Sequence, residues 1–73
     1  MKGSKEAVIL YAAKKAAESI WRSCSEPGDA PARALAIDAD VRAEFSIRSP
    51  EDTRMYKEAL FVFMLSLARA DSA

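Results

Sequence analysis

A chain of 73 residues has room for one small domain. Its 11 basic and 11 acidic residues cancel, which excludes the strongly basic surface of a dedicated nucleic-acid-binding protein. With no histidine and one cysteine, Cys24, the chain also excludes a disulfide scaffold and a Cys/His zinc site of its own. A hydrophobic content of 51% predicts a globular protein. Cys24 fits a reducing compartment, and we expect it to be a small buried hydrophobe.

Neither apolar stretch predicts export or insertion into a membrane. Residues 7–13 follow lysines as in a signal peptide, but the run is short and is ended by Lys14 and Lys15. Residues 59–68 are the most apolar stretch, and they are too few to span a bilayer, which takes about 20 residues in a helix. We therefore expect a cytoplasmic protein that makes no contact with a membrane.

The first predicted element is a helix over residues 5–24. Ser4 is the expected N-cap, and Glu6 lies in the first turn, where an acid is favourable. Apolar residues recur at helical spacing and predict a core stripe of Ile9, Leu10, Ala13, Ala16, Ala17, Ile20, Trp21 and Cys24. The pair Pro27-Gly28 predicts a turn after this helix, and Pro31 predicts a second break.

The middle of the chain, residues 33–48, supports two interpretations. Between residues 35 and 47 apolar side chains alternate with mostly polar ones, which is the period of a strand: Leu35, Ile37, Ala39, Val41, Ala43, Phe45 and Ile47. Because one strand of that length is too long for so small a domain, we expect Asp38-Ala39-Asp40 to turn it into a short hairpin. The alternative is an alanine-rich helix with a shared face of Ala34, Ile37, Val41 and Phe45. The β-branched and aromatic residues at 41–47 favour the hairpin.

The last predicted element is a helix over residues 50–70. Ser49 is the expected N-cap, Pro50 occupies the first helical position, and two acids follow in the first turn. Its predicted core stripe is Met55, Tyr56, Ala59, Leu60, Phe63, Ser66, Leu67 and Ala70. The predicted fold class is α+β, mostly α: two long helices flank a short β-hairpin or irregular segment in a single domain over residues 1–73.

Candidate catalytic and metal-binding groups are few. Two sets of acids could in principle hold a cation, Asp38 with Asp40 and Glu44, and Glu51 with Asp52, but roles in turns and helix caps explain them better. No histidine is present to act as a base for a serine nucleophile. We therefore expect a protein that is not an enzyme and that takes no metal, cofactor or small-molecule substrate.

Charge is uneven along the chain although it sums to zero. Residues 1–24 carry five basic and two acidic side chains, and residues 25–52 carry three basic and seven acidic ones. A candidate partner-binding group on the first helix lies opposite its core stripe: Val8, Tyr11, Lys15 and Arg22, with Lys14 nearby. An aromatic ring among cations can stack on a nucleic-acid base or lie along an acidic peptide. The alternative is an ordinary solvated basic face with two incidental apolar residues.

The strongest anomaly is the pair Phe61 and Leu65. They lie one turn apart on the side of the last helix that faces away from its predicted core stripe, and Val62 and Met64 widen the apolar arc. A helix that is apolar nearly all round must be covered on both sides. Either residues 35–47 cover it, or it is exposed and binds a partner or a second copy of the chain.

Taken whole, the sequence resembles small phage-encoded transcription inhibitors of Xanthomonas RNA polymerase. The chain length carries the resemblance, together with the opening MKGSKEAVILYAAKKAAESIW and the closing SPEDTRMYKEALFVFMLSLARA. The resemblance implies a protein in the host bacterial cytoplasm that binds the N-terminal end of the β′ subunit and the flap of the β subunit. It would displace the sigma factor and block initiation, with antitermination near the nascent RNA as a second activity. It assigns no contact residue to this chain.

The expected function is therefore that of a non-enzymatic, protein-binding inhibitor of bacterial RNA polymerase. Two alternatives stay open. One is a small homodimeric interaction module or an anti-defence or antitoxin-type protein. The other is a small nucleic-acid-binding protein that uses the Tyr11, Lys15 and Arg22 face.

Overall fold

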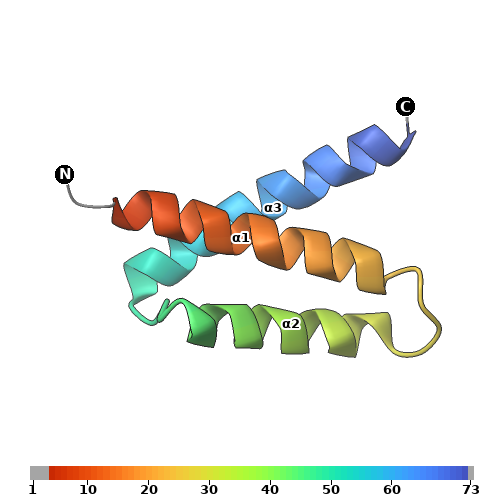
Figure 1. Cartoon of the computed structure of the whole chain (residues 1–73), viewed down its shortest axis with the longest axis horizontal. Helices are drawn as coiled ribbons and strands as arrows, with labels where there is room; N and C mark the ends of the chain where they lie inside the picture. The colour runs from red at the N-terminus through yellow and green to blue at the C-terminus, as the bar shows by residue number, and fades with distance from the viewer. Residues whose placement is uncertain (1–3, 73) are drawn as a thin grey trace.

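The computed structural model describes residues 4–72, and these form three helices joined by short connections (Figure 1). Helix α1 spans Lys5–Ser23, α2 spans Ala30–Glu44 and α3 spans Pro50–Ser72. Residues 4–72 contain no strand, so the predicted α+β class and the hairpin within residues 33–48 are wrong, and the fold is all-α.

Helices α1 and α3 begin where the sequence predicts. The Ser4 hydroxyl accepts hydrogen bonds from the backbone N–H groups of Glu6, at 3.1 Å, and Ala7, at 3.4 Å. The Ser49 hydroxyl accepts one from Asp52 N–H at 3.1 Å, and Pro50 is the first residue of α3. Each serine thus satisfies N–H groups that have no partner within the first turn of a helix.

The start of α2 explains why Pro31 is not a helix break. Asp29 is the N-cap, and its carboxylate accepts a hydrogen bond from Ala32 N–H at 3.2 Å. Pro31 lies in the first turn, where a backbone N–H would have no partner in the helix, so its missing donor costs nothing there.

The end of α2 is a Schellman motif built without glycine. Ile47 N–H donates to the Arg42 carbonyl at 2.9 Å, and Ser46 N–H donates to the Ala43 carbonyl at 3.2 Å. Ser46 takes the left-handed conformation, with φ of 56°. The side chains of Ile47 and Val41 are both buried in the core, which is the apolar contact that accompanies this motif. The last part of the apolar alternation is therefore a helix end and a turn.

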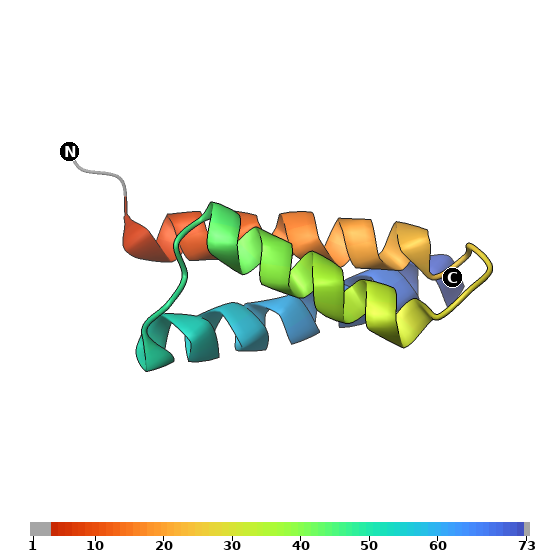
Figure 2. The same cartoon turned by 90° about the horizontal axis from the view of Figure 1, so that it is seen from below.

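Helix α1 is the centre of the fold. It packs against both other helices, whereas α2 and α3 contact each other far less. Figure 1 shows α3 crossing α1, so that its C-terminal half ends on the other side of α1 from α2, and Figure 2 shows the same three helices from below. The molecule measures 41 × 27 × 18 Å, and 18 Å is less than two helix diameters. No helix of so flat a molecule is enclosed on every side.

The core is thin and rich in alanine. Its buried members are Ile9, Ala12, Ala13, Ala16, Ala17, Ile20, Val41, Ile47 and Tyr56. Alanines on α1 let the neighbouring helices approach closely, which favours packing but buries little apolar area. A fold of this size and core should be only marginally stable.

Several residues assigned to the core stripes are not in the core. Leu10 is 41% exposed and Cys24 is exposed, so the expectation of a buried thiol is wrong. On α3, Met55 is 36% exposed, and Ser66 and Ala70 are exposed as well. The reason is geometric: a stripe drawn on a helical wheel assumes cover along the whole helix, and here the helices diverge.

The α1–α2 loop is held by one side chain, Arg33. Its Nη2 donates to the carbonyls of Ser23, at 2.7 Å, and Glu26, at 2.9 Å, and its Nη1 donates to the Pro27 carbonyl at 3.0 Å. Gly28 has φ of +116°, and a Cβ there would lie 2.7 Å from Arg33 Nη1. Only glycine therefore fits at the turn that Pro27-Gly28 predicts.

Candidate functional site

The outer face of α3, formed by Phe61, Val62 and Leu65, is the most apolar exposed surface on that helix. Phe61 is 65% exposed, Val62 57% and Leu65 41%. The opposite side of the same helix carries Tyr56, which is fully buried against α1 and α2. Residues 35–47 pack on that buried side, and they leave the α3 outer face uncovered.

A groove lies beside this face, between the N-terminal half of α2 and the middle of α3. Pro31, Ala34 and Leu35 line it from α2, and Lys57 and Leu60 line it from α3, with Ile20 of α1 and Asp38 completing it. Leu35 is 71% exposed. In a strand Leu35 would share a face with Ile37 and Val41, whereas in a helix it points away from them. The hairpin interpretation therefore did not predict that this leucine is exposed.

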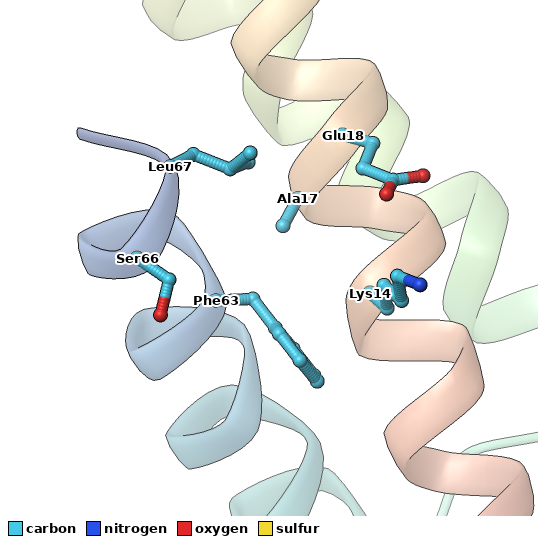
Figure 3. A pocket seen from close by; sticks show the side chains of 6 residues that line it. All are labelled: Lys14, Ala17, Glu18, Phe63, Ser66 and Leu67. Atoms are coloured by element: carbon cyan, nitrogen blue, oxygen red, sulfur yellow. The ribbon is translucent and has the colours of Figure 1, made fainter. Parts of the chain in front are cut away.

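A smaller hollow of about 210 Å³ separates α1 from the C-terminal half of α3. Figure 3 shows Ala17, Phe63 and Leu67 lining it, with Lys14, Glu18 and Ser66 also around it. It has an apolar lining with one cation and one acid nearby, and it offers no set of convergent polar groups. We read it as a gap left by diverging helices.

The cationic group predicted on α1 is exposed, but α2 engages part of it. The rings of Tyr11 and Phe45 meet edge to face, with centroids 5.7 Å apart. Lys15 Nζ lies 3.0 Å from the Glu44 carboxylate and 5.6 Å from the centre of the Phe45 ring. These contacts fix the C-terminal end of α2 on α1. A partner that used Tyr11 and Lys15 would have to compete with them.

The other members of that group are dispersed. Val8 is 44% exposed, Arg22 is exposed in the last turn of α1, and Lys14 lies at the hollow against α3. The predicted partner-binding residues of α1 and the pair Phe61 and Leu65 therefore do not form one continuous surface.

Three of the five acids considered as cation ligands pair with basic side chains. Asp38 lies 3.0 Å from Arg42, Glu44 pairs with Lys15, and Asp52 lies 3.4 Å from Lys5. Within residues 4–72 no three acidic or cysteine side chains gather as a metal site would require.

Among the residues that the structure describes, the buried Tyr56 is the one titratable group whose pKa is strongly perturbed. Burial raises its pKa, the neighbouring Asp38 carboxylate raises it further, and Arg42 opposes them. Asp38 is close enough to act on the hydroxyl, yet Tyr56 Oη and Asp38 Oδ1 do not meet in a hydrogen bond of ordinary geometry. Both atoms are enclosed by the core, so this pair has no access to a substrate and is a structural feature.

Comparisons with known proteins leave the family open. No protein-family model, curated protein or solved structure matches the chain. No helix within residues 4–72 has the length and apolar content needed to cross a membrane. The most prominent feature of the described surface is the α3 outer face.

Proposed function

We propose that this chain is a non-enzymatic protein that binds bacterial RNA polymerase and inhibits transcription initiation. The observation that carries the proposal is the α3 outer face: Phe61, Val62 and Leu65 are exposed on a helix whose other side is packed in the core. Exposed clusters of large apolar side chains are typical of surfaces that bind another protein.

The choice of target rests on the resemblance to small phage-encoded inhibitors of Xanthomonas RNA polymerase. In that scheme the partner surfaces are the N-terminal end of the β′ subunit and the flap of the β subunit. Inhibition takes the form of sigma displacement, and antitermination near the nascent RNA is a second activity. A small helical domain suits such a role, because it acts by occupying a surface.

The physical basis of the proposed inhibition is competition for a binding surface. If the protein and the sigma factor need overlapping parts of the polymerase, the tighter or more abundant one excludes the other by mass action. Aromatic and aliphatic anchors at the centre of an interface usually supply most of the binding free energy. Phe61 is the best-exposed aromatic side chain of the chain's described part, followed by Tyr11, whose ring contacts Phe45.

The proposal is tested with purified RNA polymerase holoenzyme from Xanthomonas and a promoter template. The wild-type chain should bind the holoenzyme and reduce the amount of run-off transcript. The variant carrying Phe61→Ser and Leu65→Ser should bind about 30-fold more weakly or worse, because losing an aromatic anchor typically costs about 2–4 kcal/mol at an interface.

The matched control carries Leu10→Ser and Leu35→Ser. These leucines are exposed to a similar or greater degree, at 41% and 71%, but lie on α1 and α2. The control should bind and inhibit as the wild type does. Equal inhibition by both double variants, or no binding of the wild-type chain to the holoenzyme, would refute the proposal.

A further inference from the structure

Four residues of α3 form one row along the helix surface: Lys57, Phe61, Leu65 and Arg69. Each follows the previous one by four residues, so neighbouring members stack one turn apart. All four are exposed. The row thus consists of two apolar side chains with a cation one turn before them and a cation one turn after them.

Both end cations are available to a partner. Neither Lys57 nor Arg69 makes an ion pair with the described residues. Glu58, which follows Lys57 in the chain, lies 3.6 Å from Arg54. The row therefore presents uncompensated positive charge at both ends of an apolar centre.

Rows of side chains spaced by four residues have a well-defined use in helix packing. Two helices pack most commonly by fitting such a row of each into the groove of the other, with their axes crossing at about −50°. The distance from Lys57 to Arg69 along the helix is about 18 Å, from a rise of about 1.5 Å per residue. The shape therefore fits a partner helix of about three to four turns.

The charge pattern excludes a second copy of the chain as the natural occupant. The row has the same order of charged and apolar side chains in both directions. If two copies packed row against row, parallel or antiparallel, cations would face cations at both ends. Like charges in that position disfavour association.

We propose that the α3 row binds an acidic amphipathic helix of the protein partner, with carboxylates at the two ends of its own apolar row. The complementary pattern is an acid, two apolar residues and an acid, each spaced by four residues. The inference rests on the proposed function, and it specifies the chemistry of the partner element. Phe61 and Leu65 supply the apolar contacts, and Lys57 and Arg69 favour a partner helix with acidic residues.

The test uses two synthetic helical peptides with blocked ends and a fluorescent label. Both carry leucines at the two central positions of the row, in a background of alanine and glutamine. One has glutamate at both ends of the row and the other has lysine. Binding to the full chain is measured by fluorescence anisotropy at 50 mM and 500 mM salt.

The glutamate peptide should bind about tenfold more tightly at 50 mM salt, because two ion pairs replace two like-charge contacts. The preference should shrink at 500 mM salt, where exposed charges are screened. In a variant with Lys57→Glu and Arg69→Glu the preference should reverse. A control with Lys14→Glu and Arg22→Glu, exposed cations of α1, should keep the wild-type preference.

The inference is overturned if the two peptides bind equally, if neither binds, or if the Lys57→Glu, Arg69→Glu variant keeps the wild-type preference. A dimer in sedimentation equilibrium that these two substitutions alter would overturn it as well. The outcome is separable from that of the proposed function. Holoenzyme capture that still depends on Phe61 and Leu65 would leave the proposed function standing when the peptide test fails.

Discussion

Arg33 shows how much structure one side chain can organise in a domain this small. Its guanidinium donates to three carbonyls of the α1–α2 loop, and one of them, that of Ser23, belongs to the last residue of α1. A lysine has no planar fork and cannot reproduce this geometry. The direction of α2 relative to α1 therefore depends on Arg33 and on the freedom of Gly28 to take its positive φ.

We predict that Arg33→Ala lowers the free energy of unfolding by about 1–3 kcal/mol, and that Arg33→Lys restores little of it. Urea denaturation followed by circular dichroism measures the change. Arg48→Ala is the control, because Arg48 is exposed, and it should stay within about 0.5 kcal/mol of the wild type. A loss no larger than that for Arg33→Ala would show that the loop does not need the clamp.

Tyr56 places a hydroxyl group in the core that is poorly hydrogen-bonded. Its hydroxyl is fully buried, and it has no hydrogen bond of ordinary geometry although Asp38 is close. We predict that Tyr56→Phe leaves stability at pH 7 unchanged or raises it, because it removes an inadequately paired polar group and keeps the ring. A loss of more than about 2 kcal/mol in urea denaturation at pH 7 would mean that the hydroxyl is well bonded to Asp38.

The same residue predicts a dependence on alkaline pH. Because folding raises the pKa of Tyr56, the folded chain holds a proton that the unfolded chain releases above about pH 10. The stability linked to Tyr56 is thus fully present below that pH and falls as the pH rises further. Urea midpoints at pH 8, 9.5 and 11 should drop less in Tyr56→Phe than in the wild type. Equal drops in the two proteins would rule this linkage out.

At the scale of the elements, α1 and α3 follow from local signals and α2 does not. The starts of these two helices are predicted by N-cap serines and by a proline at the first helical position: Ser4 for α1, and Ser49 with Pro50 for α3. In α2 the alternation from Leu35 to Ile47 imitates a strand, and the end of the helix has a serine in the left-handed position where glycine is usual. The alternative interpretation of this segment as a helix is the correct one. Ile37 and Val41 share a helical face with Phe45, and this face packs towards α1.

The spare apolar side of α3 was visible in the sequence, but its exposure was not. Phe61 and Leu65 stand out by helical spacing alone. Whether residues 35–47 cover them depends on where α2 lies in space, which no local pattern determines. Lys57 and Arg69 lie at either end of that pair. The sequence cannot show whether they are paired, and in the structure they form no ion pair with the described residues.

For α3 we predict a small stability cost when the pair is removed. Phe61→Ser with Leu65→Ser should lower the free energy of unfolding by about 1 kcal/mol at most, since Phe61 is 65% exposed and Leu65 41% exposed and neither belongs to the buried core. Ile9→Ala should cost about 2–5 kcal/mol, because Ile9 is 2% exposed in the core. Circular dichroism at 25 °C and thermal melts measure both. If the double variant loses as much stability as Ile9→Ala, the pair belongs to the core.

At the scale of the whole molecule, the flat arrangement of the helices affects both stability and binding. Three helices in an outline of 41 × 27 × 18 Å bury few large side chains, and α1 receives most of the contacts. The same arrangement leaves the C-terminal half of α3 with one side free. A partner that binds only the folded chain would stabilise it. The protein should therefore melt at a higher temperature when its partner is present.

Site-specific photo-crosslinking tests the central claim, that the α3 outer face binds the polymerase, most directly. Benzoyl-phenylalanine replaces Phe61 in one protein and Leu35 in a control, both of which are strongly exposed positions. Each protein is mixed with RNA polymerase holoenzyme and irradiated. We predict a crosslink from position 61 to the β′ or β subunit and a much weaker one from position 35. A crosslink from position 35 alone, or no crosslink from either position to any polymerase subunit, would contradict the account.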